Sequence, residues 1–249
     1  MYVSIIMCPS KRCILYILVM MLLGAVVLPV GAAERKSKRL EDGSLYRYPL
    51  FNGLVVGVDL FQPVATLFGQ KYANYQVSLE ADFHNRFFPV WEVGIGWADN
   101  TPDDGNFTYE VSPTLYNRLG MLYNFNYNST APGYIYAGLL YGFSVFSYDV
   151  TGITIPSGYW GTEYQASIYD QKSRAQWLEP LVGIRVNLYK GLKMGFTVRY
   201  KMLLSAKSNE TTRPWIIPGM GKRSGGFDFT YSIYYQIPIK SKAKSATAK

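Results

Sequence analysis

Several segments of the chain alternate apolar and polar side chains at every second position. In Tyr75–Phe83 the apolar residues Tyr, Val, Leu, Ala and Phe alternate with four polar ones. Leu192–Met202 repeats the pattern without interruption and carries Lys193, Arg199 and Lys201 on its polar face. A period of two is typical of a β-strand with one face in apolar surroundings. We therefore predict that both segments are amphipathic strands.

Six further segments show the same pattern and bring the number of predicted strands to eight. They are Gly53–Phe61, Val90–Ala98, Thr114–Phe125, Tyr134–Tyr148, Trp177–Leu188 and Phe227–Ile239. An even number is typical of bacterial single-chain barrels, and each segment is close to or longer than the roughly 9 to 11 residues that a tilted strand needs to cross a membrane. The sequence therefore predicts an all-β fold, an eight-stranded antiparallel transmembrane β-barrel, over residues 51–239.

The links between the predicted strands alternate in length. Links 84–89, 126–133 and 189–191 are short, whereas 62–74, 99–113, 149–176 and 203–226 are long. Outer-membrane barrels combine tight periplasmic turns with longer outside loops. This asymmetry predicts a bacterial outer-membrane protein with both termini in the periplasm. The link 149–176 has an alternative interpretation, in which it extends strands five and six above the membrane.

Glycine distinguishes a membrane barrel from a soluble lipocalin-like barrel, which alternation alone also fits. All nine glycines of the predicted strands lie on the polar faces: Gly53, Gly57, Gly94, Gly96, Gly120, Gly138, Gly142, Gly183 and Gly195. The interior of an eight-stranded barrel is just wide enough for side chains. The glycine-rich polar faces therefore fit the interior, and the bulky aromatic faces are predicted to point to lipid.

The predicted inward face carries six acidic and five basic side chains. They are Asp59, Glu80, Asp82, Glu92, Arg118, Glu179, Arg185, Lys193, Arg199, Lys201 and Asp228. Unpaired charges in a narrow lumen are costly, so we expect these groups to pair and to close the barrel. A narrow channel for small solutes is the alternative.

The first 33 residues have the organisation of an export signal. Lys11 and Arg12 precede an apolar run from Cys13 to Val30, and the small residues Gly31 to Ala33 follow. We predict a cleaved signal peptide over 1–33, a periplasmic segment over 34–50 and a basic periplasmic tail over 240–249. The alternative is a permanent membrane anchor, since the run approaches the length of a spanning helix. Cleavage leaves 23 basic and 17 acidic residues and no cysteine.

Composition agrees with a membrane location. Only 17% of residues are charged, whereas aromatic residues make up 16%, and a soluble domain typically has about 25% charged residues. The net charge of +8 is concentrated at the chain ends. Nucleic-acid binding needs a basic stripe on a folded face, so we expect no nucleic-acid partner.

The tracts YIYAGLLYGFSVF and FDFTYSIYYQIPI, which begin at Tyr134 and Phe227, are rich in aromatic residues, and the first also contains Gly138 and Gly142. With them, the chain resembles the small OmpX and OmpA-type barrels of Gram-negative bacteria. It is more similar to an uncharacterised family of outer-membrane β-barrel proteins from Bacteroidetes-type bacteria. The resemblance covers about residues 50 to 239 and implies no catalytic residues.

Candidate catalytic and metal-binding residues are few. His84, the only histidine, falls in a predicted turn, where a structural role is favoured over catalysis. Asp103 and Asp104 lie in a Gly/Pro loop, which is more typical of a solvated turn than of a cation site. No metal spacing, phosphate loop or dinucleotide fingerprint occurs. We therefore expect no enzymatic activity, metal or cofactor.

Among the long loops, 205–226 contains Trp215, Ile216 and Ile217 between two prolines. This apolar wedge is either a contact site for another protein or lipid, or a segment that folds onto the rim of the barrel.

The sequence predicts a structural or surface-interaction barrel whose partners are outer-membrane lipid, the barrel-assembly machinery during insertion and an unidentified surface molecule. A small-solute channel and an outer-leaflet lipid-modifying enzyme are the alternatives.

Overall fold

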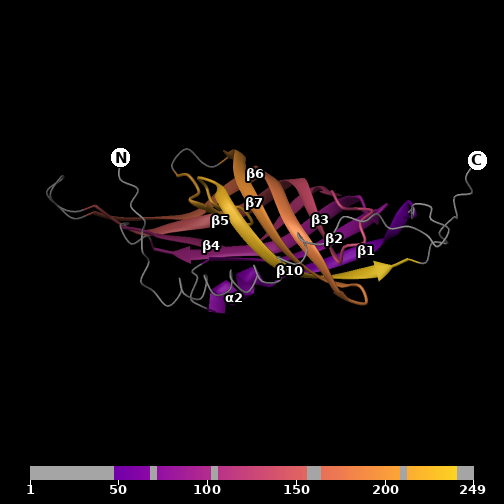
Figure 1. Cartoon of the computed structure of the whole chain (residues 1–249). Coiled ribbons are helices and arrows are strands. Elements are labelled where there is room, and N and C mark those ends of the chain that lie inside the picture. Colours follow the sequence, from indigo (N-terminus) through magenta and orange to yellow (C-terminus); the bar gives the residue numbers. More distant parts are fainter. Residues whose placement is uncertain (1–47, 68–71, 102–105, 156–163, 208–211, 240–249) are drawn as a thin grey trace, which may run out of the picture.

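The computed structural model describes residues 48–67, 72–101, 106–155, 164–207 and 212–239. Eight antiparallel strands of this part form one closed barrel (Figure 1). The strands are β1 (Phe51–Asp59), β2 (Tyr72–Phe83), β3 (Phe87–Asn100), β4 (Thr108–Asn124), β5 (Gly133–Ile155), β6 (Tyr164–Tyr189), β7 (Leu192–Lys207) and β10 (Gly226–Pro238). The prediction of an eight-stranded antiparallel barrel is confirmed.

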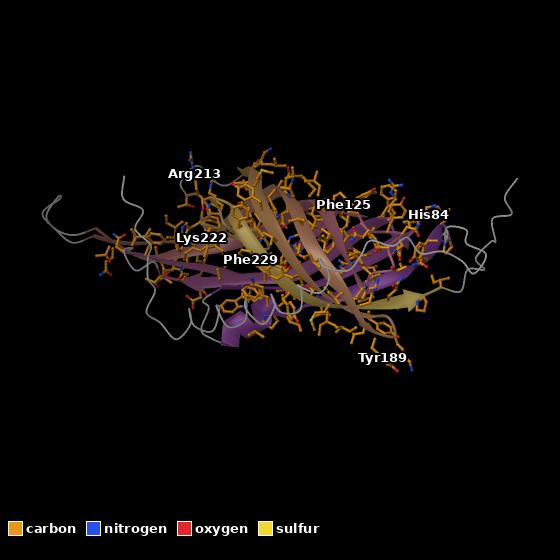
Figure 2. All side chains as sticks on the ribbon, in the orientation of Figure 1. His84, Phe125, Tyr189, Arg213, Lys222 and Phe229 are labelled. Atoms are coloured by element: carbon orange, nitrogen blue, oxygen red, sulfur yellow. The ribbon has the colours of Figure 1, made fainter. Side chains whose placement is uncertain are left out.

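Each barrel strand pairs with its neighbours in the chain, and β1 pairs with β10 to close the ring. The links 84–86, 125–132 and 190–191 lie at one end, which we call the short-turn end. The strands β1, β3, β5 and β7 finish at the opposite end, before the links 60–71, 101–107, 156–163 and 208–225, and we call it the long-loop end. Figure 2 shows His84 and Tyr189 toward the short-turn end and Arg213 and Lys222 toward the long-loop end. The alternation of link lengths is incomplete in the fold, because the eight residues of 125–132 equal those of 156–163 in number and exceed the seven of 101–107.

The turn between β2 and β3 shows how local chemistry sets the strand register. His84 and Asn85 both have a φ of 56°, as the central residues of a type I′ hairpin turn require. The backbone N–H of Asn85 donates to Asp82 Oδ1 at 2.7 Å. A tight turn of this type matches the twist of the two strands that it connects.

Strands β4 to β7 continue further toward the long-loop end than predicted. In β5 and β6, the pairing of Ile153 with Ala166 and of Thr154 with Gln165 lies well beyond the predicted strand ends. Much of the predicted link 149–176 is therefore paired strand, which confirms its interpretation as an extension. This hairpin projects past the barrel wall at the left of Figure 1.

Two elements near the long-loop end were not predicted. Helix α2 (Phe61–Leu67) follows β1 and packs near β2 and β10, and Asp59 Oδ1 accepts the backbone N–H of Phe61 at 3.1 Å. Strands β8 (Ile216–Ile217) and β9 (Gly221–Lys222) form a small separate hairpin. Both elements are too short for a periodic sequence signal. No helix in the described ranges is long and apolar enough to cross a membrane.

The outer surface of the wall is apolar and continuous across the strands. Cross-strand pairing connects Leu79 to Trp91, Trp91 to Leu119, and Leu119 to Tyr141. Leu119 is 48% exposed and Trp91 is 46% exposed, although both are large and apolar. Exposed apolar surface that continues from strand to strand is unusual for a soluble monomer.

Several predicted segments fall outside the described residues. They include the signal peptide over 1–33, most of the segment 34–50, the tail 240–249, and Asp103 with Asp104. These remain predictions from the sequence.

Candidate functional site

The barrel lumen brings together the eleven charged residues of the predicted inward face. Ten are buried: Asp59, Glu80, Asp82, Glu92, Arg118, Glu179, Arg185, Lys193, Arg199 and Lys201. The side chain of Asp228 is 24% exposed. Strand geometry explains this placement, because alternate residues of each strand point into the barrel.

Two arginines and two glutamates form a ring in the middle of the lumen. Arg118 lies 2.9 Å from Glu92 and 3.0 Å from Glu179. Arg199 lies 2.9 Å from Glu92 and 3.2 Å from Glu179. Each guanidinium therefore bridges both carboxylates. We call these four residues the central ring.

The central ring spans the lumen. Glu92 lies on β3 and Arg199 on β7, which are separated by three strands on either side of the closed barrel. Two Arg199 nitrogens nevertheless donate to Glu92, at 2.9 and 3.1 Å. Charge-assisted bonds of this kind are among the stronger hydrogen bonds in proteins. They tie opposite walls together across the middle of the barrel.

A second ion pair crosses the lumen nearer the short-turn end. Arg185 on β6 donates two 2.6 Å hydrogen bonds to Glu80 on the opposite strand β2. Aromatic rings surround the guanidinium, with its carbon 4.7 Å from the centre of the Tyr136 ring and 3.8 Å from that of Tyr234. The rings supply cation–π stabilisation in addition to the ion pair.

An apolar layer includes Val90, Leu122, Leu140 and Leu181, all buried in one cluster. Leu122 and Leu140 interrupt the polar face of their strands in the sequence. In the fold they cover Gly138 and Gly120, whose backbones they approach closely. Their apparent irregularity is therefore a packing arrangement inside the barrel.

Asp59, Asp82 and Lys193 form no ion pair among the described residues, so the expectation that all eleven charges pair is not met. Asp59 and Asp82 accept hydrogen bonds from backbone and amide groups instead. Lys193 lies over the Tyr134 ring, 5.3 Å from its centre. The remaining pair, Lys201 and Asp228, lies near the long-loop end at 2.6 Å.

The described part of the last long loop, residues 212–225, enters the lumen. Ile216, Ile217 and Met220 pack with inward aromatic residues that include Tyr109 and Trp177. The Tyr109 hydroxyl donates to the carbonyl of Ile216 at 2.9 Å. We call residues 214–222 the plug.

Gly219 attaches the plug to the charged interior. Its carbonyl accepts from Arg118 at 2.6 Å and from Lys201 at 3.0 Å, and its N–H donates to Asn74 Oδ1 at 2.8 Å. A φ of 84° and close contact with the Tyr116 ring favour glycine at this position. Arg118 therefore belongs to the central ring and also holds the plug.

Of the two interpretations of Trp215, Ile216 and Ile217, the arrangement is close to a segment folded onto the rim, except that the segment enters the lumen. Ile216 and Ile217 are buried, and Trp215 packs edge-on against Phe107 and Tyr109. The segment folds inward because an apolar pocket of aromatic side chains is available there. In this conformation, Ile216 and Ile217 cannot contact a partner.

Sequence analysis missed the large aromatic residues of the lumen, including Tyr116, Tyr136 and Trp177. Each lies directly opposite a glycine in the strand register: Gly94, Gly183 and Gly142. The glycine backbones leave space for these rings. Pairing the predicted strands in this register places these three glycines opposite aromatic residues, which is the signal that could have identified them.

His84 lies in the exposed turn, where its Nδ1 is 3.1 Å from the carbonyl oxygen of Tyr48. No group of three or more His, Cys, Asp or Glu residues suitable for a metal occurs in the described part of the chain.

A protein-family model described as "Domain of unknown function (DUF6048)" matches residues 13–242. The chain belongs to this family. No match was found among curated proteins. Among solved structures, the chain is similar to a major outer membrane protein from Thermus thermophilus at 14% sequence identity, covering 75% of this chain and 99% of that chain, with a TM-score of 0.38.

Proposed function

We propose that this protein is a bacterial outer-membrane barrel with a closed lumen, which acts as a structural or surface-interaction protein. Polarity supports the location, because charged groups lie inside and apolar groups lie outside. Leu115 and Val145 are each 61% exposed on the outer surface. A lipid environment removes the energetic cost of such exposure.

The short-turn end is assigned to the periplasm, because two of its three links, 84–86 and 190–191, have only three and two residues, and the turns of outer-membrane barrels are short on that side. The guanidinium carbon of Arg86 lies within 5.3 Å of the ring centres of Phe87, Tyr123 and Tyr127. Lys190 lies 4.9 Å from the Tyr189 ring centre. Aromatic and basic side chains together are typical of a membrane interface.

The observation that carries the closed lumen is the pairing of Arg199 with Glu92 across the barrel. A solute would have to break bonds to two buried carboxylates, and leaving a buried charge unpaired is strongly unfavourable. The plug covers the ring on the long-loop side through Arg118. We propose no catalytic activity, since the inward carboxylates of the ring are engaged by arginines.

The extended hairpin of β5 and β6 is the proposed surface for a partner outside the cell. It carries the charged side chains of Lys172 and Arg174, which are exposed. With the plug folded inward, this hairpin replaces the loop 203–226 as the surface that we assign to interaction.

The test is current recording from the purified full chain in a planar bilayer, together with fractionation of cell membranes. We expect the protein in the outer-membrane fraction and no steady current at any applied voltage. A Gly219→Ala variant, which weakens only the plug, is expected to remain non-conducting because the central ring persists. Steady single-channel currents from the unmutated protein would instead establish a channel, and a soluble periplasmic monomer would overturn the location.

A further inference from the structure

The short-turn end of the lumen contains a cavity of about 390 Å³ lined mainly by polar residues. It lies beyond the Glu80–Arg185 pair and is bounded by β1, β7, β10 and the turn 125–132. A volume of this size is within the range of small-molecule sites, about 300 to 1,000 Å³. The groups that line it determine what ligand chemistry it can accept.

Among the described residues, Lys193 is the only charged one that lines this cavity. It is 5% exposed, and its ammonium donates no hydrogen bond to a protein acceptor in the described ranges. Its contact there is with the face of Tyr134. Buried charges are normally paired because their desolvation is costly. Asp82 and Glu80 act on the ammonium electrostatically, but among the described residues neither forms an ion pair with it. The ammonium can therefore take a direct anionic partner from the cavity.

Asp82, a carboxylate that acts on Lys193 electrostatically, already accepts hydrogen bonds from other groups. Asp82 Oδ2 accepts from Asn52 Nδ2 at 2.7 Å and from Gln236 Nε2 at 3.1 Å. Its Oδ1 accepts the backbone N–H of Asn85. These three donors stabilise the carboxylate and leave Lys193 outside the group.

The same bonds orient two amides of the cavity. Because a carboxylate accepts hydrogen bonds, Asn52 and Gln236 direct their NH₂ groups to Asp82. Their amide oxygens remain as acceptors, and both residues line the cavity. The cavity thus offers one cationic donor and two carbonyl acceptors.

We propose that this cavity binds a small carboxylate that also carries N–H or O–H donors, the chemistry shared by short peptides and sugar acids. The carboxylate pairs with Lys193, and the donor groups bond to the amide oxygens of Asn52 and Gln236. A monoanion fits better than a dianion, because the cavity has one cation and lies next to Asp82. The binding site is independent of the proposed location, although that location would open it to the periplasm.

The test uses the purified full chain in detergent, with calorimetric titration of N-acetyl-alanyl-alanine as the peptide probe and galacturonate as the sugar-acid probe. N-acetyl-alanyl-alanine amide and galactose, which lack the carboxylate, are the matched uncharged controls. We expect at least one acid to bind, its uncharged counterpart to bind at least tenfold more weakly, and the comparison of the two acids to identify the source. Absence of binding by both acids, or equal binding of an acid and its uncharged counterpart, would overturn the proposal.

Variants test the role of the ammonium. We expect Lys193→Met to reduce acid binding at least tenfold, and Lys190→Met, in the adjacent turn and outside the cavity, to leave it unchanged. Heat-dependent gel migration checks that each variant is folded. The bound acid should also raise the urea midpoint of the unmutated protein but not that of Lys193→Met. Equal binding by the two variants would overturn the assignment of Lys193, whatever the outcome for membrane location.

Discussion

The two ends of the lumen differ in how each buried lysine is paired. Toward the long-loop end, Lys201 pairs with Asp228, the plug fills the space, and the cavity beside them is about 140 Å³. At the short-turn end, Lys193 has no ion pair among the described residues and borders a cavity of about 390 Å³. One lumen therefore combines a sealed, stabilising region at the long-loop end with the proposed ligand site at the short-turn end.

Within the sealed region, the largest loss of stability is expected from a substitution in the central ring. We expect Arg199→Ala to lower the free energy of unfolding by about 3 to 5 kcal/mol, because Glu92 and Glu179 both lose a buried cation. Urea titration followed by gel migration measures the loss. Arg174→Ala, an exposed arginine on β6, is the control and should have little effect. Equal losses for the two variants would contradict a stabilising ring.

A second prediction compares neighbouring residues of β7 that point to opposite sides of the barrel wall. Val198 lies next to Arg199 on β7 and points outward, paired with Val182 and Phe229. Val198→Arg is expected to cost about 2 to 4 kcal/mol if it lies near the middle of the bilayer. Thr197→Ser, on the inner side, keeps the hydroxyl that contacts Tyr136 and should be nearly silent. Refolding yields into lipid vesicles that are alike for both variants would refute the inside-outside assignment.

A substitution in the plug is expected to cause a smaller loss of stability. In Gly219→Ala the added methyl group meets the Tyr116 ring, and the φ of 84° strains alanine. We expect a loss of about 1 to 3 kcal/mol, typical of overpacking. A cysteine introduced by Ile217→Cys reports plug release, since the predicted mature chain has no cysteine. The thiol should resist labelling alone and react when combined with Gly219→Ala; equal labelling rates would show that the plug is not held by Gly219.

The smallest change in the free energy of unfolding is expected at the short-turn end, at Lys193. Without ligand, Lys193→Met should not reduce the free energy of unfolding, because it removes a buried charge that lacks an ionic partner among the described residues. Urea midpoints of the variant and the unmutated protein test this expectation. A loss similar to that of Arg199→Ala would mean that Lys193 already stabilises the barrel, and the distinction between the two ends would fail.

Much of the fold could be predicted from local pattern. Alternation over Tyr75–Phe83 and Leu192–Met202 identified β2 and β7, and the glycines on the polar faces indicated which side points inward. The same argument selected the eleven charged residues that the structure places in or at the edge of the lumen. These properties are accessible because side-chain direction in a strand repeats every two residues.

The tertiary structure alone decided which charges meet. Glu92 could be expected beside Arg118, its partner in the β3–β4 register, but its bonds to Arg199 depend on closure of the barrel and on strand tilt. The plug likewise required the fold, since Trp215, Ile216 and Ile217 carry no period and fit any apolar surface. Barrel closure brings residues more than 100 positions apart into contact. Such distances depend on the arrangement of all eight strands, so no single segment of sequence encodes them.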